Sequence, residues 1–234
     1  MPVRISFWSR LLDTIAPRQC VVCGSRLSPT EQALCSRCNL HLPRTGFHRT
    51  PLDNPMARLF WGQIDVERVA ALFFYEAGSE AAQILFDMKY QGHPETARTM
   101  GRIMAAEMVD GGFFSGIDMI VPVPLAPKRL RQRGYNQSHY LAMGIADITG
   151  LPLSTQVACR TEFQKSQTRL LRWQRQENVE GVFKLRDAGA VCGHHVLLVD
   201  DVVTTGATTI ACGRELLSAG NVTLSILSLA FTKQ

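Results

Sequence analysis

The sequence predicts an α/β protein in which a mostly parallel sheet is flanked by helices and preceded by a small cysteine-rich module. Apolar runs typical of strands alternate with segments of helical periodicity from residue 69 onwards. Val196–Val199 is continuously apolar, as expected for a strand that is buried on both faces of a parallel sheet. Two Cys-x2-Cys pairs lie within residues 20–38 and predict the separate module.

Length and composition limit the classes of protein that fit. A chain of 234 residues suits one α/β domain with a small appendage, and 46% hydrophobic residues are enough for a sizeable core. The formal net charge of +5 restricts any nucleic-acid-binding surface to a local patch. Because there is no run of 18 apolar residues, we expect no membrane span and a cytoplasmic protein.

The cysteine pairs predict a structural zinc site. Seven cysteines are an odd number, and the pairing of four of them favours a metal over disulfides. A redox pair and two disulfides are the alternatives, and the spacer of eleven residues is shorter than usual. A module this small depends on its metal, which contributes roughly 10–16 kcal/mol in isolated fingers. The expected ligands are Cys20, Cys23, Cys35 and Cys38.

The remaining elements follow from periodicity and from Gly and Pro positions. Residues 1–48 are expected to form an N-terminal helix and the zinc ribbon, and residues 49–234 the main domain, with a linker over 43–63. Ser79 is the expected N-cap of its helix, and Gly150 terminates another. Strands are expected at 69–75, 117–123, 151–157, 196–199 and 222–231. Helices are expected at 3–16, 79–88, 95–109 and 210–219, and another helix follows the basic segment at 128–133 and ends near 149.

The segment that follows Val196–Val199 predicts a sugar-phosphate site. Asp200 and Asp201 come where the strand emerges, and their carboxylates suit sugar hydroxyls or a divalent ion. The small, hydroxyl-rich residues 204–208 precede a helix, whose N-terminus attracts phosphate. The segment lacks the lysine of a P-loop. A plain turn between strand and helix is the alternative.

Two basic segments also follow strands. The first holds Lys128, Arg129, Arg131 and Arg133, and the second, within residues 160–180, holds Lys165, Arg169, Arg172 and Arg175. Cations at the carboxyl edge of a sheet suit a ligand with several negative charges. A solvated basic face and an exposed amphipathic helix are the respective alternatives.

Residues 196–209 resemble the phosphoribosyl-pyrophosphate (PRPP) binding motif of type I phosphoribosyltransferases. The resemblance implies that Asp200 and Asp201 hold the ribose hydroxyls, that residues 204–208 hold the 5′-phosphate, and that Mg²⁺ accompanies PRPP. Lys128, Arg129, Arg131 and Arg133 would border the pyrophosphate. The implied catalytic residues are Asp200, Asp201, Arg169 and Lys89. The implied PRPP-binding residues are Val199, Asp200, Asp201, Thr204, Thr205, Gly206, Ala207 and Thr208.

Nearly the whole chain resembles the ComF family of competence-associated proteins. The motifs that carry this likeness, besides the cysteine pairs and the PRPP motif, occur in order: Lys89-Tyr90-Gln91-Gly92, Pro122-Val123-Pro124, Arg131-x-Arg133-Gly134-Tyr135-Asn136-Gln137, and Lys165-Ser166-Gln167-Thr168 with Arg175 and Asn178. The likeness implies a zinc ribbon joined to a type I phosphoribosyltransferase fold, a flexible hood over 160–178, and a role in the uptake or use of external DNA.

Three functions follow as hypotheses. The chain is expected to bind PRPP, or a ribose 5-phosphate moiety, in the service of DNA uptake, as an active or formerly active phosphoribosyltransferase. Alternatively, it is a non-enzymatic adaptor that binds single-stranded DNA and a helicase-like uptake partner. An ordinary nucleobase salvage enzyme is the third hypothesis, although such an enzyme needs no zinc ribbon. The acceptor substrate, and whether turnover occurs, are left open.

Overall fold

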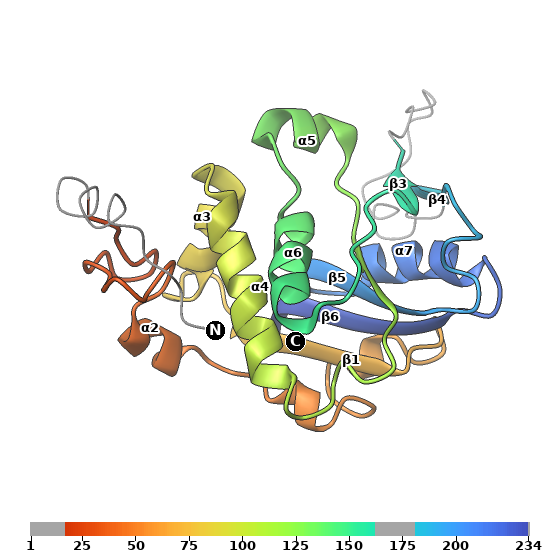
Figure 1. Ribbon diagram of the computed structural model, residues 1–234, viewed down its shortest axis with the longest axis horizontal. Coiled ribbons are helices and arrows are strands. Elements are labelled where there is room, and N and C mark those ends of the chain that lie inside the picture. Colours follow the sequence, from red (N-terminus) through yellow and green to blue (C-terminus); the bar gives the residue numbers. More distant parts are fainter. Residues whose placement is uncertain (1–16, 162–180, 234) are drawn as a thin grey trace, which may run out of the picture.

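The computed structural model describes residues 17–161 and 181–233 and confirms the α/β class (Figure 1). Its main sheet has four strands in the order β1-β6-β5-β2, and every neighbouring pair is parallel. Each strand lies where an apolar run predicted one. The strands are β1 (Arg68–Tyr75), β2 (Met119–Pro122), β5 (His195–Val203) and β6 (Thr223–Thr232).

Strands β5 and β6 form the centre of the sheet. They are buried along most of their length because helices cover both faces of a parallel sheet. β5 extends past the predicted end at Val199, since Val202 and Val203 still pair with β6. The prediction was too short because two acids looked like the end of a strand. Instead, Asp200 and Asp201 belong to β5 itself.

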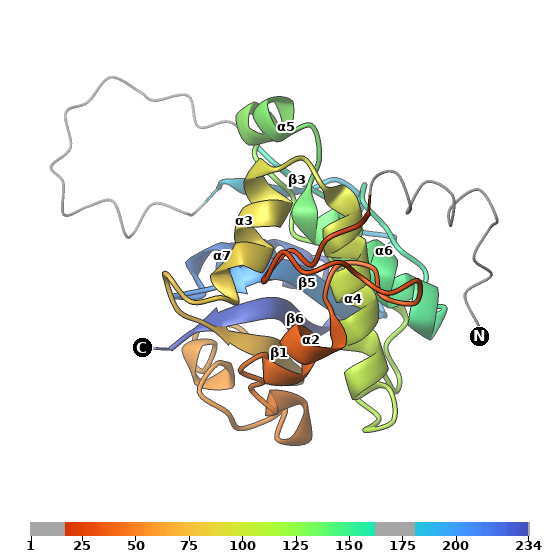
Figure 2. The same cartoon turned by 90° about the vertical axis from the view of Figure 1, so that its left-hand side faces the viewer.

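Helices α4 and α6 lie side by side over one face of the sheet (Figures 1 and 2). The methionines of α4, at 100, 104 and 108, are fully buried, which confirms that they belong to the core. Helix α7, which joins β5 to β6, lies on the opposite face (Figure 2). The longer helices are α3 (Ala82–Tyr90), α4 (Pro94–Met108), α6 (Gln137–Thr149) and α7 (Ala207–Leu217).

Shorter elements surround this body. The cysteine-rich module contains α2 (Ser36–His41). A short helix, α5 (Pro127–Arg133), projects above the sheet in both views (Figures 1 and 2). An antiparallel ribbon of β3 (Ala158–Arg160) and β4 (Phe183–Leu185) packs near α7.

The expectation of a linker over 43–63 is wrong. This segment forms two short 3-10 helices, η1 (Phe47–Arg49) and η2 (Ala57–Leu59), and it buries Phe47 and Phe60 in the core. Asn54 fixes its path: the side-chain Nδ2 donates to the carbonyls of Thr50 and Val69, both at 2.9 Å. The prolines and polar residues that suggested a linker are turn residues of a packed segment.

Two local predictions also fail. Ser79 does not cap α3, which begins at Ala82; its hydroxyl donates to the carbonyl of Glu76 instead. Residues 151–157 form no strand, because only Leu153 makes a bridge, to Ile120 of β2. The helix expected at 3–16 lies outside the described residues. Within 17–161 and 181–233, no helix is long and apolar enough to span a membrane.

Candidate functional site at the end of strand β5

The paired acids stand at the carboxyl edge of the sheet. β2 ends at Pro122, which pairs with Val199, so β5 carries Asp200 and Asp201 beyond its neighbour. Asp200 is buried, and its Oδ1 accepts hydrogen bonds from the backbone N–H of Asp201 at 2.8 Å and from the Ser138 hydroxyl at 3.2 Å. The Thr209 hydroxyl donates to its Oδ2 at 3.4 Å. Three segments of the chain therefore hold one carboxyl group in place.

The environment of Asp200 keeps a proton available near neutral pH. Burial and, to a smaller extent, the neighbouring charge of Asp201 together raise the pKa of Asp200 from 3.8 to about 7. The hydrogen bonds that Asp200 accepts and the ammonium of Lys89 oppose this rise. A ligand hydroxyl group or a cation would therefore alter the protonation of this pair when it binds.

Lys89 reaches the acids from the far end of α3. Its Nζ lies 2.9 Å from Oδ2 of Asp201, and both side chains are largely shielded from water. The Tyr135 hydroxyl donates to the carbonyl of Met88 at 2.6 Å and so anchors the end of the helix that carries Lys89. The sequence prediction included Lys89 but missed this role for Tyr135. Its place in the Arg-Gly-Tyr-Asn-Gln motif was the available signal.

A cavity of about 620 Å³ opens beside the acids. The hydroxyl-rich segment contributes Thr204 and Thr208, and Gly206 between them adopts φ +79° to start α7. Thr205, Gly206, Ala207 and Val199 do not line the cavity. The charged side chains that line it are Lys89, Arg129, Arg133, Arg160, Asp200 and Asp201.

The basic segment 128–133 lies within the short helix α5. Pro127 occupies the first turn of α5, and Gly134 ends it with φ +84°. Helical spacing turns Arg129 and Arg133 towards the cavity, whereas Lys128 and Arg131 are not among its described lining residues. The Arg133 guanidinium also lies 5.8 Å from the ring centroid of Tyr90. The four cations predicted as one group thus divide into two pairs.

The second basic segment is described only at its edges. Arg169, the predicted catalytic arginine, lies outside the described residues, as do Lys165, Arg172 and Arg175. Arg160 precedes them on β3 and lines the cavity. Burial lowers the pKa of Arg160, and the neighbouring Arg129 lowers it further, while Asp200 opposes the change. An anionic ligand would relieve the repulsion between the two guanidinium groups.

The start of α6 adds an uncharged donor. Asn136 caps the helix by accepting a hydrogen bond from the backbone N–H of Ser138, and its Nδ2 donates to the carbonyl of Val123. Gln137 is 1% exposed and lines the cavity, yet its Nε2 has no hydrogen-bond partner among the described residues. Buried amides are usually paired, so this group supports an oxygen-rich ligand.

The four predicted metal ligands come together in the N-terminal module. The sulfur atoms of Cys20, Cys23, Cys35 and Cys38 all lie within 4.8 Å of one another, and no cysteine of the described residues forms a disulfide. The 3.8 Å between Sγ of Cys23 and Sγ of Cys35 matches roughly the 3.8 Å edge of a tetrahedron with 2.3 Å Zn–S bonds. The cluster therefore has the ligand set and spacing of a closed, structural metal site.

Comparison with known proteins finds relatives along the full chain. DNA utilization protein YhgH of Shigella flexneri is 27% identical over 235 residues, which cover 99% of this chain and 94% of that protein. Competence protein F of Haemophilus influenzae is 24% identical over 223 residues, 91% of this chain and 96% of the relative. Competence protein ComFC of Bacillus subtilis is 33% identical over 102 residues, 44% and 39% of the two chains. No protein-family model matches.

Solved structures match part of this chain. The allosteric regulatory enzyme of purine biosynthesis matches with a TM-score of 0.39 and 21% identity, over 56% of this chain and 25% of that one. A hypoxanthine-guanine phosphoribosyl transferase of L. donovani matches with a TM-score of 0.36 and 18% identity, over 58% of this chain and 68% of that one. The fold class is established by the order and direction of the chain's own strands.

Proposed function

From the premise that this chain is a homologue of the competence-associated ComF proteins, we propose that it binds PRPP, or a ribose 5-phosphate moiety, with Mg²⁺ and acts in the uptake or use of external DNA. One observation carries the proposal. A single cavity brings together paired acids, a hydroxyl-rich segment at a helix N-terminus, and two arginines of α5. The ligand class with a diol, a terminal phosphate and a second polyanionic group matches these three features.

Each part of the ligand has a matching part of the cavity. The 5′-phosphate would lie near Thr204 and Thr208, which line the cavity beside the N-terminus of α7. The ribose hydroxyls would bond to Asp200 and Asp201. The pyrophosphate would face Arg129 and Arg133, which provide charge for that group.

The two carboxylates also suit the metal that accompanies such a ligand. Carboxylate oxygens are the ligands that Mg²⁺ prefers, and the metal would neutralise part of the pyrophosphate charge. In a transfer reaction the C1–O bond to pyrophosphate breaks and pyrophosphate leaves with the electron pair, while the acceptor forms the new bond to C1. The contribution of the chain would be to orient the ligand and to stabilise the leaving charge with Arg129 and Arg133.

Calorimetric titration of the full chain with PRPP and Mg²⁺ tests the proposal. We expect saturable binding that is lost when Asp200→Asn is combined with Asp201→Asn, because the diol and the metal lose their ligands. Asp110→Asn, at an exposed position away from the cavity, is the matched control. Absence of heat with the wild-type chain, or unchanged heat with the double variant, would refute PRPP binding.

A specific observation also favours the adaptor function. No residue of α5 is buried, and Lys128 and Arg131 lie outside the PRPP cavity on a helix that projects from the body (Figure 1). Such cations suit the phosphates of a single strand. Binding of an oligonucleotide should weaken with salt, and Lys128→Gln with Arg131→Gln should lower the salt slope by roughly 1–2. The same double variant should leave PRPP affinity unchanged. An undiminished slope would exclude a role for this pair.

A further inference from the structure

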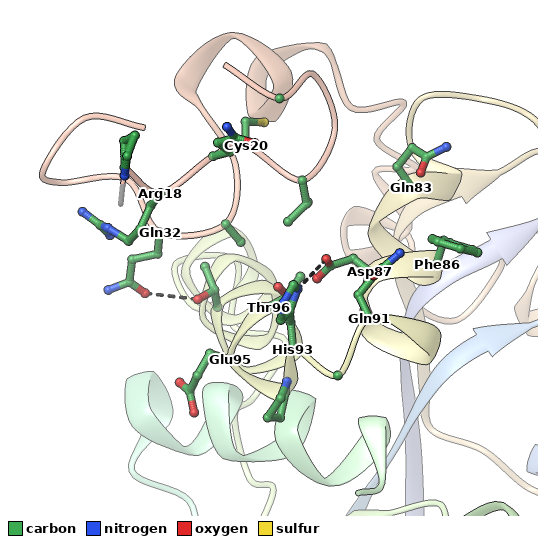
Figure 3. A pocket seen from close by; sticks show the side chains of 18 of the residues that line it. Arg18, Cys20, Gln32, Gln83, Phe86, Asp87, Gln91, His93, Glu95 and Thr96 are labelled. Atoms are coloured by element: carbon green, nitrogen blue, oxygen red, sulfur yellow. Dashed lines mark hydrogen bonds and ion pairs between the residues drawn. The ribbon is translucent and has the colours of Figure 1, made fainter. Parts of the chain in front are cut away.

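A second cavity, of about 1040 Å³, separates the cysteine-rich module from helices α3 and α4 (Figure 3). No described residue lines both this cavity and the one at Asp200. Figure 3 shows Gln83 and Phe86 of α3 on one side and Arg18 and Gln32 of the module on the other, with Asp87 between them.

The lining of this cavity suits an uncharged, planar group. Phe86 is 48% exposed, although apolar rings of this size are normally covered. The cationic side chains are already engaged: Arg18 donates to the carbonyl of Glu31 at 2.8 Å, and Arg102 pairs with Asp147 at 2.8 Å. Amide groups, which form paired hydrogen bonds with base edges, come from Gln19, Gln32, Gln83 and Gln91.

Asp87 adds an acceptor that lacks a donor. The residue is 8% exposed, and one carboxylate oxygen bonds to Nδ1 of His93 at 2.8 Å. The other oxygen, Oδ2, is buried and has no hydrogen-bond partner among the described residues. Buried carboxylate oxygens normally accept at least one hydrogen bond, so a ligand N–H group would complete this environment.

We propose that this cavity is a second ligand site, which binds a nucleobase that carries an exocyclic amino group. Phe86 stacks on the ring, and Asp87 accepts from the amino group, while the glutamine amides bond to the remaining edge. This site goes beyond the proposed PRPP cavity, because it needs no phosphate. A free nucleoside and an unpaired base of a single strand both present this chemistry.

The exposed face of α3 connects the two sites. A third cavity, of about 510 Å³, shares Gln83 and Phe86 with the nucleobase site and Lys89 and Tyr90 with the PRPP cavity. The rings of Phe86 and Tyr90 lie 5.3 Å apart between centroids, and Tyr90 is 69% exposed. If one base of a single-stranded nucleic acid occupies the nucleobase site, its neighbouring base can therefore stack on Tyr90, in the direction of Lys89.

Binding of phosphate-free probes tests the nucleobase site. Titration of the metal-loaded full chain should show that adenosine binds at least about fivefold more tightly than purine riboside, which lacks only the amino group. Phe86→Leu should weaken adenosine binding by about tenfold through lost stacking. Trp61→Leu, at an aromatic residue that is 55% exposed but lines neither cavity, should not change it. Asp87→Asn should bring the affinities of adenosine and purine riboside close together.

A parallel titration with an oligomer of deoxyadenosine identifies the source of the base. If both adenosine and the oligomer bind and both depend on Phe86, the site accepts free nucleosides. If only the oligomer binds in a Phe86-dependent way, the site accepts a base of single-stranded DNA. If neither probe binds, or if Phe86→Leu leaves both affinities unchanged, the proposal is wrong. Adenosine binding should persist in the Asp200→Asn, Asp201→Asn variant, so failure of the PRPP proposal is distinguishable from failure of this one.

Discussion

At the scale of single residues, the site depends on a carboxyl group that is costly to bury. Asp200 is buried at the end of a central strand and is held by Ser138, Thr209 and the backbone of Asp201. Such an arrangement lowers the stability of the free protein and leaves the acid positioned for a ligand. The acids at 200 and 201 therefore reduce the folding stability of the chain, and a turn with only a structural role would have no reason to keep them.

Asp200→Asn should stabilise the free protein at alkaline pH. Because the folded-state pKa of Asp200 is raised from 3.8 to about 7, its contribution to stability is present below pH 4 and lost as pH rises through 7. The free energy of unfolding of the variant, relative to wild type, should increase over this range, by up to roughly 4 kcal/mol. Urea unfolding at pH 4 to 8 measures it, with Asp110→Asn as the control. If the free energies of unfolding of wild type and Asp200→Asn changed in parallel with pH, Asp200 would not be the group whose pKa is raised.

Tyr135→Phe should weaken both the fold and the site. The change leaves the carbonyl of Met88 without its 2.6 Å donor and should cost about 1–3 kcal/mol. Because Lys89 follows Met88, the affinity for PRPP should fall as well. Tyr140→Phe is the control, since this ring packs against Tyr135 at 5.5 Å and leaves the Tyr135 hydroxyl in place. Denaturant titration and calorimetry measure the two effects, and wild-type values in both would exclude the anchoring role.

At the scale of elements, the body depends on close contact between α4 and α6. An added Cβ at Gly101 would lie 2.1 Å from the carbonyl oxygen of Leu141, and one at Gly144 would lie 2.0 Å from that of Arg98. Glycine disfavours a helix interior, so these two positions look unfavourable in the sequence alone. The tertiary contact reverses this preference, because only glycine lets the two backbones approach.

Gly144→Ala should therefore destabilise the protein, although alanine is the better helix former. Displacing the α4 backbone should cost about 3 kcal/mol or more, which exceeds the gain in helix propensity of about 1 kcal/mol. Gly111→Ala is the matched control, because its Cβ would meet its nearest neighbour, the carbonyl oxygen of Met108, at 3.6 Å. Thermal unfolding of both variants decides the matter. Equal melting temperatures would show that the helices adjust without cost.

At the scale of the whole molecule, the metal module packs against the α/β body and shares its hydrophobic core. Gln32 of the module accepts hydrogen bonds from Thr99 and Arg102 of α4, each at 3.1 Å. The nucleobase cavity lies along this joint, whereas the PRPP cavity is formed by the body alone. Loss of the metal should therefore affect the two sites differently.

Removal of the metal with a chelator should unfold the module first. We expect one zinc ion per chain, increased hydrogen exchange over residues 17–42, and loss of adenosine binding with PRPP binding retained. Cys23→Ser should reproduce the effect, because it removes a ligand. Cys192→Ser, also at an exposed cysteine, should keep the metal. A metal-free chain with unchanged exchange over 17–42 would rule out a structural role.

The sequence by itself determined the local features of this protein. Continuous apolar runs predicted the parallel strands, cysteine spacing predicted the cluster of four cysteines, and Gly206 among the threonines predicted the turn between β5 and α7. These features depend on neighbouring residues, so periodicity and spacing reveal them. Residues 43–63 misled the same reasoning, because turn residues look alike in a linker and in a packed segment.

The tertiary structure alone decided which distant residues meet. The ion pair of Lys89 with Asp201, the bond from Ser138 to Asp200, and the meeting of Arg160 with Arg129 and Arg133 in one cavity join parts of the chain that lie far apart. Neither propensity nor spacing encodes such contacts, because they arise when helices pack over a sheet and bury polar groups together. The nucleobase cavity also depends on tertiary structure, because its lining residues come from the module and from α3 and α4.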